Sequence, residues 1–226
     1  QAGSSWRSIP LVANDSYLRP LIVAEPNHNW QDLRRALHRR DDWSVQHRVV
    51  ELLPEVAENH SDSVELLLTE ALPPCDPEVR YEAVESLGRL GERAKPAVPA
   101  LIAIMKKAEH SEGLTRRAAE ALAKIDPQAL IQAADDEYWT AGFQAAQGLA
   151  NLGKKAEFAL PYLMQELRSP RNRSDPDRAA YLGAAIYQIN PRDGFDEVAE
   201  LLHEPEETRI AAIEALGGMA PRAKEA

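Results

Sequence analysis

Hydrophobic residues recur at spacings of three and four through residues 77–107, where the chain shows its pattern most clearly. Such spacing places side chains on one face of an α-helix. The first apolar stripe consists of Val79, Ala83, Val84, Leu87 and Leu90. A second stripe follows a short polar connection and consists of Val98, Leu101, Ile102 and Met105. The stretch therefore predicts two amphipathic helices joined by a tight corner.

Proline and glycine mark the ends of these two helices. Pro77 suits the first turn of a helix, because its missing N–H has no intrahelical partner there. Gly91 follows the last apolar residue, where a left-handed C-cap favours glycine. Pro96 stands where the second helix can begin. Neither helix could bury its apolar face alone, so we expect each pair to stack on similar neighbours.

The two-helix pattern recurs further along the chain. Residues 153–168 match residues 91–106 at a fixed offset of 62 positions. Residues 216–226 match residues 87–97 at an offset of 129 positions and reproduce the connection that leads into a second helix. The chain is therefore predicted to be an array of two-helix repeats.

Weaker copies of the first helix complete the array, at residues 45–56, 115–125 and 179–189. The last apolar residues of the first helices are spaced by 34, 35, 27, 37 and 30 positions: Val56, Leu90, Ile125, Leu152, Ile189 and Met219. Ankyrin and tetratricopeptide arrays hold tighter periods. Capping residues and apolar spacing predict the other helices near residues 30–40, 43–59, 61–72, 112–125, 127–135, 138–152, 155–168, 177–189, 194–203 and 205–219.

The pattern VR-x2-AV-x2-LG-x-LG, followed by AKPAVPALI, resembles a HEAT repeat of the short, phycobilin-lyase-like class. The resemblance covers roughly residues 29–226 and is strongest at 77–107 and 153–168. It implies an all-α fold, an α-α superhelix of the right-handed HEAT/armadillo-like solenoid type. First helices would lie on the convex side and second helices on the concave side. Binding scaffolds dominate this family, so the resemblance implies a mode of action rather than a reaction.

The resemblance and the pattern together divide the chain into two parts. Residues 1–28 contain three prolines that interrupt any helical period, and we interpret them as an extended N-terminal arm or linker. Residues 29–226 are predicted to form a solenoid of about six repeats. Since the last copy stops in the connection before its second helix, we expect the array to continue beyond residue 226 in a longer protein.

Charge and composition narrow the range of partners. The net charge of −10 argues against general binding of nucleic acid, which needs clustered lysine and arginine. No apolar run approaches the length that inserts into a membrane. Residues 33–48 carry five arginines, whereas residues 193–207 carry seven carboxylates and neither lysine nor arginine. This polarity would orient a protein partner; the alternative is a charged surface without a role.

Three classes of HEAT enzyme that use the groove are the alternatives to a scaffold. Deoxyhypusine hydroxylases bind iron through several His-Glu pairs, but this chain has a single pair, His203-Glu204. Phycobilin lyases cradle a bilin, and no residue here is diagnostic of that activity. A DNA glycosylase would need aromatic side chains and a carboxylate on a basic face, and the chain has these residue types at Trp43, Asp136, Tyr138 and Trp139. Its acidic charge opposes this function, and packing within first helices explains the two tryptophans.

The sequence therefore predicts a non-enzymatic scaffold that binds a protein partner, with no cofactor and no metal. The partner's identity does not follow from the sequence. Positions that alternate with the buried stripes of the second helices should face the concave side: Ala100, Ala103 and Lys106 in one copy, and Tyr162, Gln165 and Arg168 in the other. Four of them, Lys106, Tyr162, Gln165 and Arg168, are the predicted binding residues, since tyrosine and arginine are common anchors. The alternative is that Tyr162 only covers a gap between helices.

Overall fold

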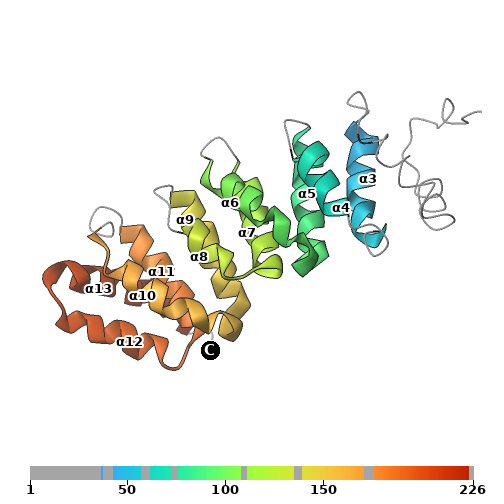
Figure 1. Cartoon of the computed structure of the whole chain (residues 1–226). Coiled ribbons are helices and arrows are strands. Elements are labelled where there is room, and N and C mark those ends of the chain that lie inside the picture. Colours follow the sequence, from blue (N-terminus) through green and yellow to red (C-terminus); the bar gives the residue numbers. More distant parts are fainter. Residues whose placement is uncertain are drawn as a thin grey trace, which may run out of the picture. The chain divides into compact units, whose positions relative to one another are not determined.

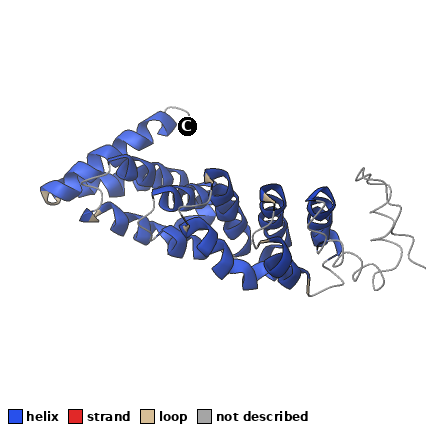
Figure 2. Cartoon of the chain, turned by 90° about the horizontal axis from the view of Figure 1, so that it is seen from above, coloured by secondary structure: helices blue, strands red, loops and turns tan. Residues whose placement is uncertain are grey.

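A computed structural model describes residues 37, 43–56, 62–72, 76–107, 111–134, 139–170 and 176–223 (Figure 1). All regular elements among these residues are helices (Figure 2), which confirms the predicted all-α fold class. None of the described helices has both the length and the apolar character needed to span a bilayer. The arm predicted for residues 1–28 lies outside the described residues. So does the helix expected at residues 30–40, except for Leu37, which is helical and buried.

The chain divides into two compact units, Gln1–Leu90 and Gly91–Ala226. The described helices of the first unit are α3 (Trp43–Val56), α4 (Ser63–Leu66), the π-helical segment η2 (Leu67–Ala71) and α5 (Pro77–Leu90). Helices α3 and α5 pack against each other. The buried Ser86 hydroxyl on α5 donates a 2.8 Å hydrogen bond to the Val50 carbonyl on α3, so this polar group keeps a partner inside the interface.

The helix predicted for residues 61–72 differs in detail from the observed structure. Its first part is α-helical, whereas η2 has the wider π-helical turn, in which the Leu72 N–H donates to the Leu67 carbonyl at 3.0 Å. In a π-helical turn the backbone N–H donates to the carbonyl five residues earlier instead of four. Periodicity alone could not predict it, because the apolar residues still fall on one side.

Two glycines fix the corners of the clearest repeats. Gly91 has φ of +57° and Gly153 has φ of +54°, a left-handed conformation that glycine adopts without strain. Each glycine is the first residue of a 3-10 helical segment, η3 (Gly91–Ala97) or η4 (Gly153–Ala159). Both segments bury two alanines completely: Ala94 and Ala97 in η3, and Ala156 and Ala159 in η4. The predicted C-cap at Gly91 and the predicted repeat 62 positions later are confirmed.

The second unit contains two rows of helices. The first helices of its repeats are α7 (Glu112–Ile125), α9 (Trp139–Leu152), α11 (Pro176–Ile189) and α13 (Glu206–Ala223). The second helices are α6 (Val98–Lys106), α8 (Ala129–Ala134), α10 (Leu160–Leu167) and α12 (Gly194–Glu200), the last followed by the 3-10 turn η6 (Leu201–His203). Helices α7, α9, α11 and α13 pack in that order, and α6, α8, α10 and α12 each pack against a neighbouring first helix.

The end of α13 departs from the sequence prediction. The offset of 129 positions placed a corner here, but α13 continues as a helix through residues 217–223. The residue that corresponds to Gly91 is Ala220. Because alanine lacks the freedom of glycine to adopt a left-handed turn, the corner predicted at this place does not form.

Candidate protein-binding surfaces

The buried stripes predicted for α6 and α10 are largely confirmed. Five of the eight side chains are buried: Leu101, Met105, Leu163, Met164 and Leu167. The other three, Val98, Ile102 and Leu160, are partly exposed. Burying a leucine side chain fully contributes roughly 1.5–3 kcal/mol, so these stripes hold the second helices onto their neighbours.

The four predicted binding residues do not form one cluster. Tyr162, Gln165 and Arg168 follow α10 at a spacing of three residues, whereas Lys106 is half-buried at the end of α6. Helix α6 packs against α8, and α10 packs against α11 and α13. The repeat that contains α8 lies between α6 and α10 in the chain, so Lys106 belongs to a different part of the second-helix row.

The three residues on α10 also differ in what they present to a partner. Gln165 is exposed. The Arg168 side chain is 44% exposed, but its Nε donates a 3.1 Å hydrogen bond to Glu204 and its Nη1 donates to the Met164 carbonyl at 3.3 Å. The hydroxyl oxygen of Tyr162 is buried. Tyr162 therefore does not present its polar end to solvent, which favours the alternative that it fills space between helices.

A buried ion pair joins α10 to α11 close to Tyr162. The Arg178 guanidinium donates a short hydrogen bond to the carboxylate of Glu166, and Arg178 is only 6% exposed. Burial alone would lower the pKa of Arg178, but the nearby Tyr181 and Glu166 outweigh it and raise the pKa. Tyr162 acts in the same direction on Arg178. This group of side chains therefore fixes α10 against α11.

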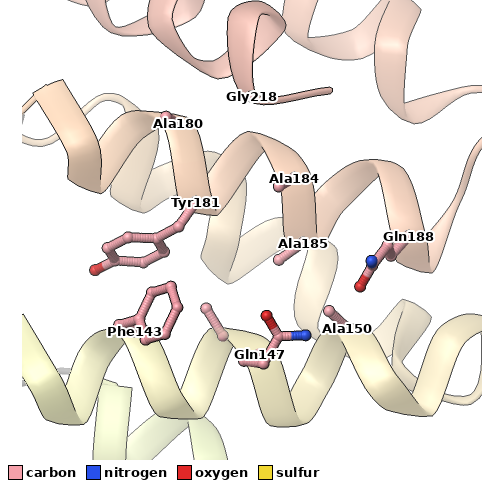
Figure 3. Close-up of a pocket in the computed structure, with 10 residues that line it drawn as sticks. Phe143, Gln147, Ala150, Ala180, Tyr181, Ala184, Ala185, Gln188 and Gly218 are labelled. Atoms are coloured by element: carbon pink, nitrogen blue, oxygen red, sulfur yellow. The ribbon is translucent and has the colours of Figure 1, made fainter. Parts of the chain in front are cut away.

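A hollow lies on the other row of helices, between α9 and α11. It has a volume of about 260 Å³ and is lined by Phe143, Ala146, Gln147 and Ala150 of α9, by Ala180, Tyr181, Ala184, Ala185 and Gln188 of α11, and by Gly218 of α13. Figure 3 shows Phe143 and Gln147 extending from α9 toward Tyr181 and Gln188, which extend from α11. We call this hollow the α9–α11 groove.

The aromatic end of the groove is fixed by close packing. The rings of Phe143 and Tyr181 meet edge to face, with centroids 5.5 Å apart and planes at 86°. The Tyr181 hydroxyl lies beside Gly142, where an added Cβ would be 3.0 Å from the oxygen. Glycine at position 142 therefore leaves room for this hydroxyl and for the ring orientation that goes with it.

Amides and alanines form the rest of the groove. The Gln147 side chain is partly exposed and its Nε2 donates a 3.1 Å hydrogen bond to Asn151 on the same helix. Gln188 is also partly exposed, on the facing helix. A side-chain amide has both a donor and an acceptor, so it can pair with a peptide backbone N–H and C=O together. Apolar walls with a few amides are typical of sites that receive a peptide or a small molecule.

The sequence prediction missed this groove because it sought binding residues only on the second helices. A signal was nevertheless present. Ala146 and Ala150 are four residues apart on α9, and Ala180 and Ala184 are four residues apart on α11. Small residues at that spacing form a strip along one face of a helix. Two such strips on adjacent helices, each beside an aromatic residue, leave a hollow between them.

Trp43 and the other residues with the side-chain types of a DNA glycosylase site do not form a site among the described residues. Trp43 is 53% exposed, so the interpretation that packing explains it is wrong. Its ring meets that of His47 edge to face at 6.4 Å on the same helix, α3. Asp136, Tyr138 and the side chain of Trp139 lie outside the described residues. Within the described part of the chain, no three histidine, cysteine or acidic side chains are grouped as a metal site would need.

Comparison with known proteins identifies the repeats. Residues 31–123 match the family model of HEAT repeats. These residues belong to the HEAT-repeat family. The matched residues include the two-helix unit 77–107, where the repeat pattern is clearest. None of the curated proteins matches the chain significantly.

Two solved structures show similarity to this chain. One is an engineered protein with 19% sequence identity and a TM-score of 0.39, and the similarity covers 84% of this chain and 99% of that one. The other is a designed armadillo repeat protein solved in complex with the peptide (KR)4. It has 16% identity and a TM-score of 0.40, and the similarity covers 83% of this chain and 98% of that one.

Proposed function

We propose that this HEAT-repeat chain is a non-enzymatic scaffold that binds a segment of a partner protein in the α9–α11 groove. One observation carries the proposal: a hollow with alanine walls has an aromatic pair at one end and amides on both sides. The alanines allow a partner backbone to approach closely. Gln147 and Gln188 would then pair with its peptide groups, and the Phe143 and Tyr181 rings would contact an apolar side chain.

The face of α10 is the second candidate surface, as the sequence predicted. Gln165 and Arg168 are exposed there, which supports it. Two observations weigh against it in comparison with the groove. Arg168 would have to leave Glu204 or share it with the partner, and the Tyr162 hydroxyl is turned into the protein.

Substitutions that remove polar side chains from the two surfaces distinguish them. Gln147→Ala with Gln188→Ala changes the groove, and Gln165→Ala with Arg168→Ala changes the α10 face. Gln132→Ala, at an exposed position of α8, is a matched control. A native partner is first captured with the unmodified chain, and its Kd is then measured for each variant. Losing two hydrogen bonds of about 1 kcal/mol each weakens binding by at least about tenfold.

We expect that loss for the groove variant alone, with unchanged helical content by circular dichroism. If the partner binds the groove variant normally but does not bind the α10 variant, the binding site lies on the second helices and the groove proposal is wrong. A partner that binds all three variants equally would overturn both surfaces.

A further inference from the structure

The Tyr181 side chain belongs to two different parts of the fold. Its ring lines the α9–α11 groove and packs edge to face on Phe143. Its hydroxyl points away from Gln188, which lines the groove further along α11 (Figure 3). The ring is therefore part of the binding surface, whereas the hydroxyl takes part in the packing between helices.

Three helices meet at the Tyr181 hydroxyl. A Cβ added to Gly142 of α9 would be 3.0 Å from this oxygen, 3.6 Å from the Ala134 carbonyl oxygen of α8 and 3.9 Å from Nη1 of Arg178 on α11. Atoms of α8 and α11 thus lie around one point on α9. The hydroxyl and the Arg178 guanidinium both reach this point, so what happens at the guanidinium bears directly on the position of the hydroxyl.

Arg178 connects this meeting point to α10. Its Nη2 donates a hydrogen bond to the Glu166 carboxylate, whereas Nη1 is the atom beside Gly142. The Arg178 side chain is 7% exposed and that of Glu166 is 13% exposed. Burial lowers the pKa of Arg178, but Tyr181 and then Glu166 raise it, as groups close to the guanidinium do. The guanidinium therefore faces the α10 carboxylate with one nitrogen and the Tyr181 hydroxyl with the other.

We propose that Arg178 is a positioning residue for the α9–α11 groove and that Glu166 of α10 acts on the groove through it. Arg178 holds the hydroxyl and thereby the angle at which the Tyr181 ring meets Phe143. The guanidinium has little freedom to move, because leaving Glu166 would strand a buried charge.

The aromatic end of the groove therefore keeps one shape before a partner arrives. A pre-organised site loses less entropy when it binds, so the position of the ring contributes to affinity. The inference rests on the proposed function of the groove and adds that a residue of the second-helix row controls it.

A fluorine label at residue 143 reports the arrangement of the rings without any partner. para-Fluorophenylalanine replaces Phe143 alone, and its fluorine NMR signal is recorded in the intact chain. Tyr181→Phe removes only the hydroxyl. We expect the signal to broaden or to move toward its position in the urea-unfolded chain, because the ring edge is no longer held at one angle.

Tyr187→Phe is the matched control for this change. It removes a hydroxyl from the same helix, at a partly exposed position that does not line the groove, and should leave the signal unchanged. An unchanged signal in Tyr181→Phe, or an equal change in both variants, would overturn the proposal. A side chain that only joins the helices together would lower the melting temperature without altering the label.

Glu166→Gln tests the connection to α10. It keeps an oxygen acceptor for Arg178 but removes the charge. We expect the signal to change as in Tyr181→Phe, and the double variant to add nothing further, because both changes break one connection. Arg178→Lys gives the same test if Glu166→Gln does not fold, since a single ammonium lacks the second branch of the guanidinium. Additive changes, or a folded variant with the original signal, would contradict the proposal.

Binding measurements complete the test with the partner protein captured by the unmodified chain. Glu166 does not line the groove, yet Glu166→Gln should weaken the Kd by about two- to thirtyfold, the range of residues coupled to a site that they do not touch. A changed signal with an unchanged Kd would overturn the positioning role.

The positioning role and the proposed function can fail separately. If Gln147→Ala with Gln188→Ala weakens the partner but Glu166→Gln alters neither the signal nor the Kd, only the positioning role fails. If the Phe143 label responds as expected but the groove variant binds the partner normally, the function proposed for the groove fails, while the effect of Arg178 on the ring stands.

Discussion

Arg178 occupies a position that the repeat pattern reserves for an apolar residue. Counting back from the end of each first helix, Arg178 on α11 corresponds to Val79 on α5, and both are buried. The arginine is accommodated because Glu166 on α10 faces it. A buried charge without a partner costs far more than an exposed one. The pair therefore restricts the relative position of α10 and α11 to arrangements in which Arg178 and Glu166 remain in contact.

Substitution of Arg178 should consequently be far more costly than loss of an exposed arginine. Arg178→Ala leaves Glu166 partly buried without this partner, and should lower the free energy of unfolding by roughly 3–5 kcal/mol. Arg116→Ala removes a 2.6 Å pair with Glu120 in which both side chains are about half exposed, and should cost less than about 1 kcal/mol. Urea denaturation of the two variants makes the comparison. Similar losses in both would show that burial of the Arg178 pair has no energetic consequence.

At Glu82 on α5 the effect of burial on the pKa is larger than that of the ion-pair partner, whereas at Arg178 the partners outweigh burial. Burial raises the pKa of the Glu82 carboxyl above its ordinary value, although Arg89, at 2.7 Å, acts to lower it. The folded protein therefore holds this proton more tightly than the unfolded chain does. Above the ordinary pKa of about 4.5 the folded state begins to be penalised by the ionised carboxylate, so this residue lowers stability as the pH rises through that window.

Glu82→Gln should remove that pH-dependent penalty. We expect the variant to gain stability relative to the unmodified protein as the pH is raised from 4 toward 7, because its amide does not ionise. Thermal melts across this pH range measure the difference. Glu157→Gln removes the same charge from an exposed site in η4 and serves as the control. A Glu82→Gln variant whose advantage grows as the pH falls would contradict the assigned direction.

At the scale of elements, α11 and α13 approach each other backbone to backbone. A Cβ added to Gly183 on α11 would overlap the Ala215 carbonyl of α13, and one added to Gly218 on α13 would overlap the Ala180 carbonyl of α11. Backbone atoms cannot move aside as a flexible side chain does. These two glycines therefore set the separation of the helices, and Gly218 also borders the α9–α11 groove.

Gly217 and Gly218 are adjacent on α13 and allow a matched test of the close contact between α11 and α13. Gly218→Ala should destabilise the protein by about 1–3 kcal/mol or more, because the helices must separate. Gly217→Ala meets nothing within 4 Å and removes a helix-weakening glycine, so it should be neutral or stabilising by up to about 1 kcal/mol. Thermal and urea unfolding of both variants give the values. Equal effects would show that the helices do not meet where the structure places them.

At the scale of the molecule, the two-helix unit could be predicted from the sequence because each of its features depends on residues that are close together in the chain. Gly91 and Gly153 fix the corners through their own backbone conformation, and the apolar spacing identifies the buried face of each helix. The lack of a corner near Ala220 could also have been predicted, because alanine replaces glycine at the position that corresponds to Gly91.

The surfaces were harder to predict because they depend on which helices become neighbours. The side-chain direction of Tyr162 is set by contacts with another helix, and the spacing of α10 alone assigned it to the surface. The groove exists only because the alanine strips of α9 and α11 face each other.

Protein binding in the α9–α11 groove is the central claim, and hydrogen–deuterium exchange of the complex with its native partner tests it most directly. We expect exchange to slow in Trp139–Leu152 and Pro176–Ile189, the helices that line the groove, relative to the unbound protein. Helix α10 should be unchanged. Protection confined to Leu160–Leu167, or no protection in α9 and α11, would contradict the claim.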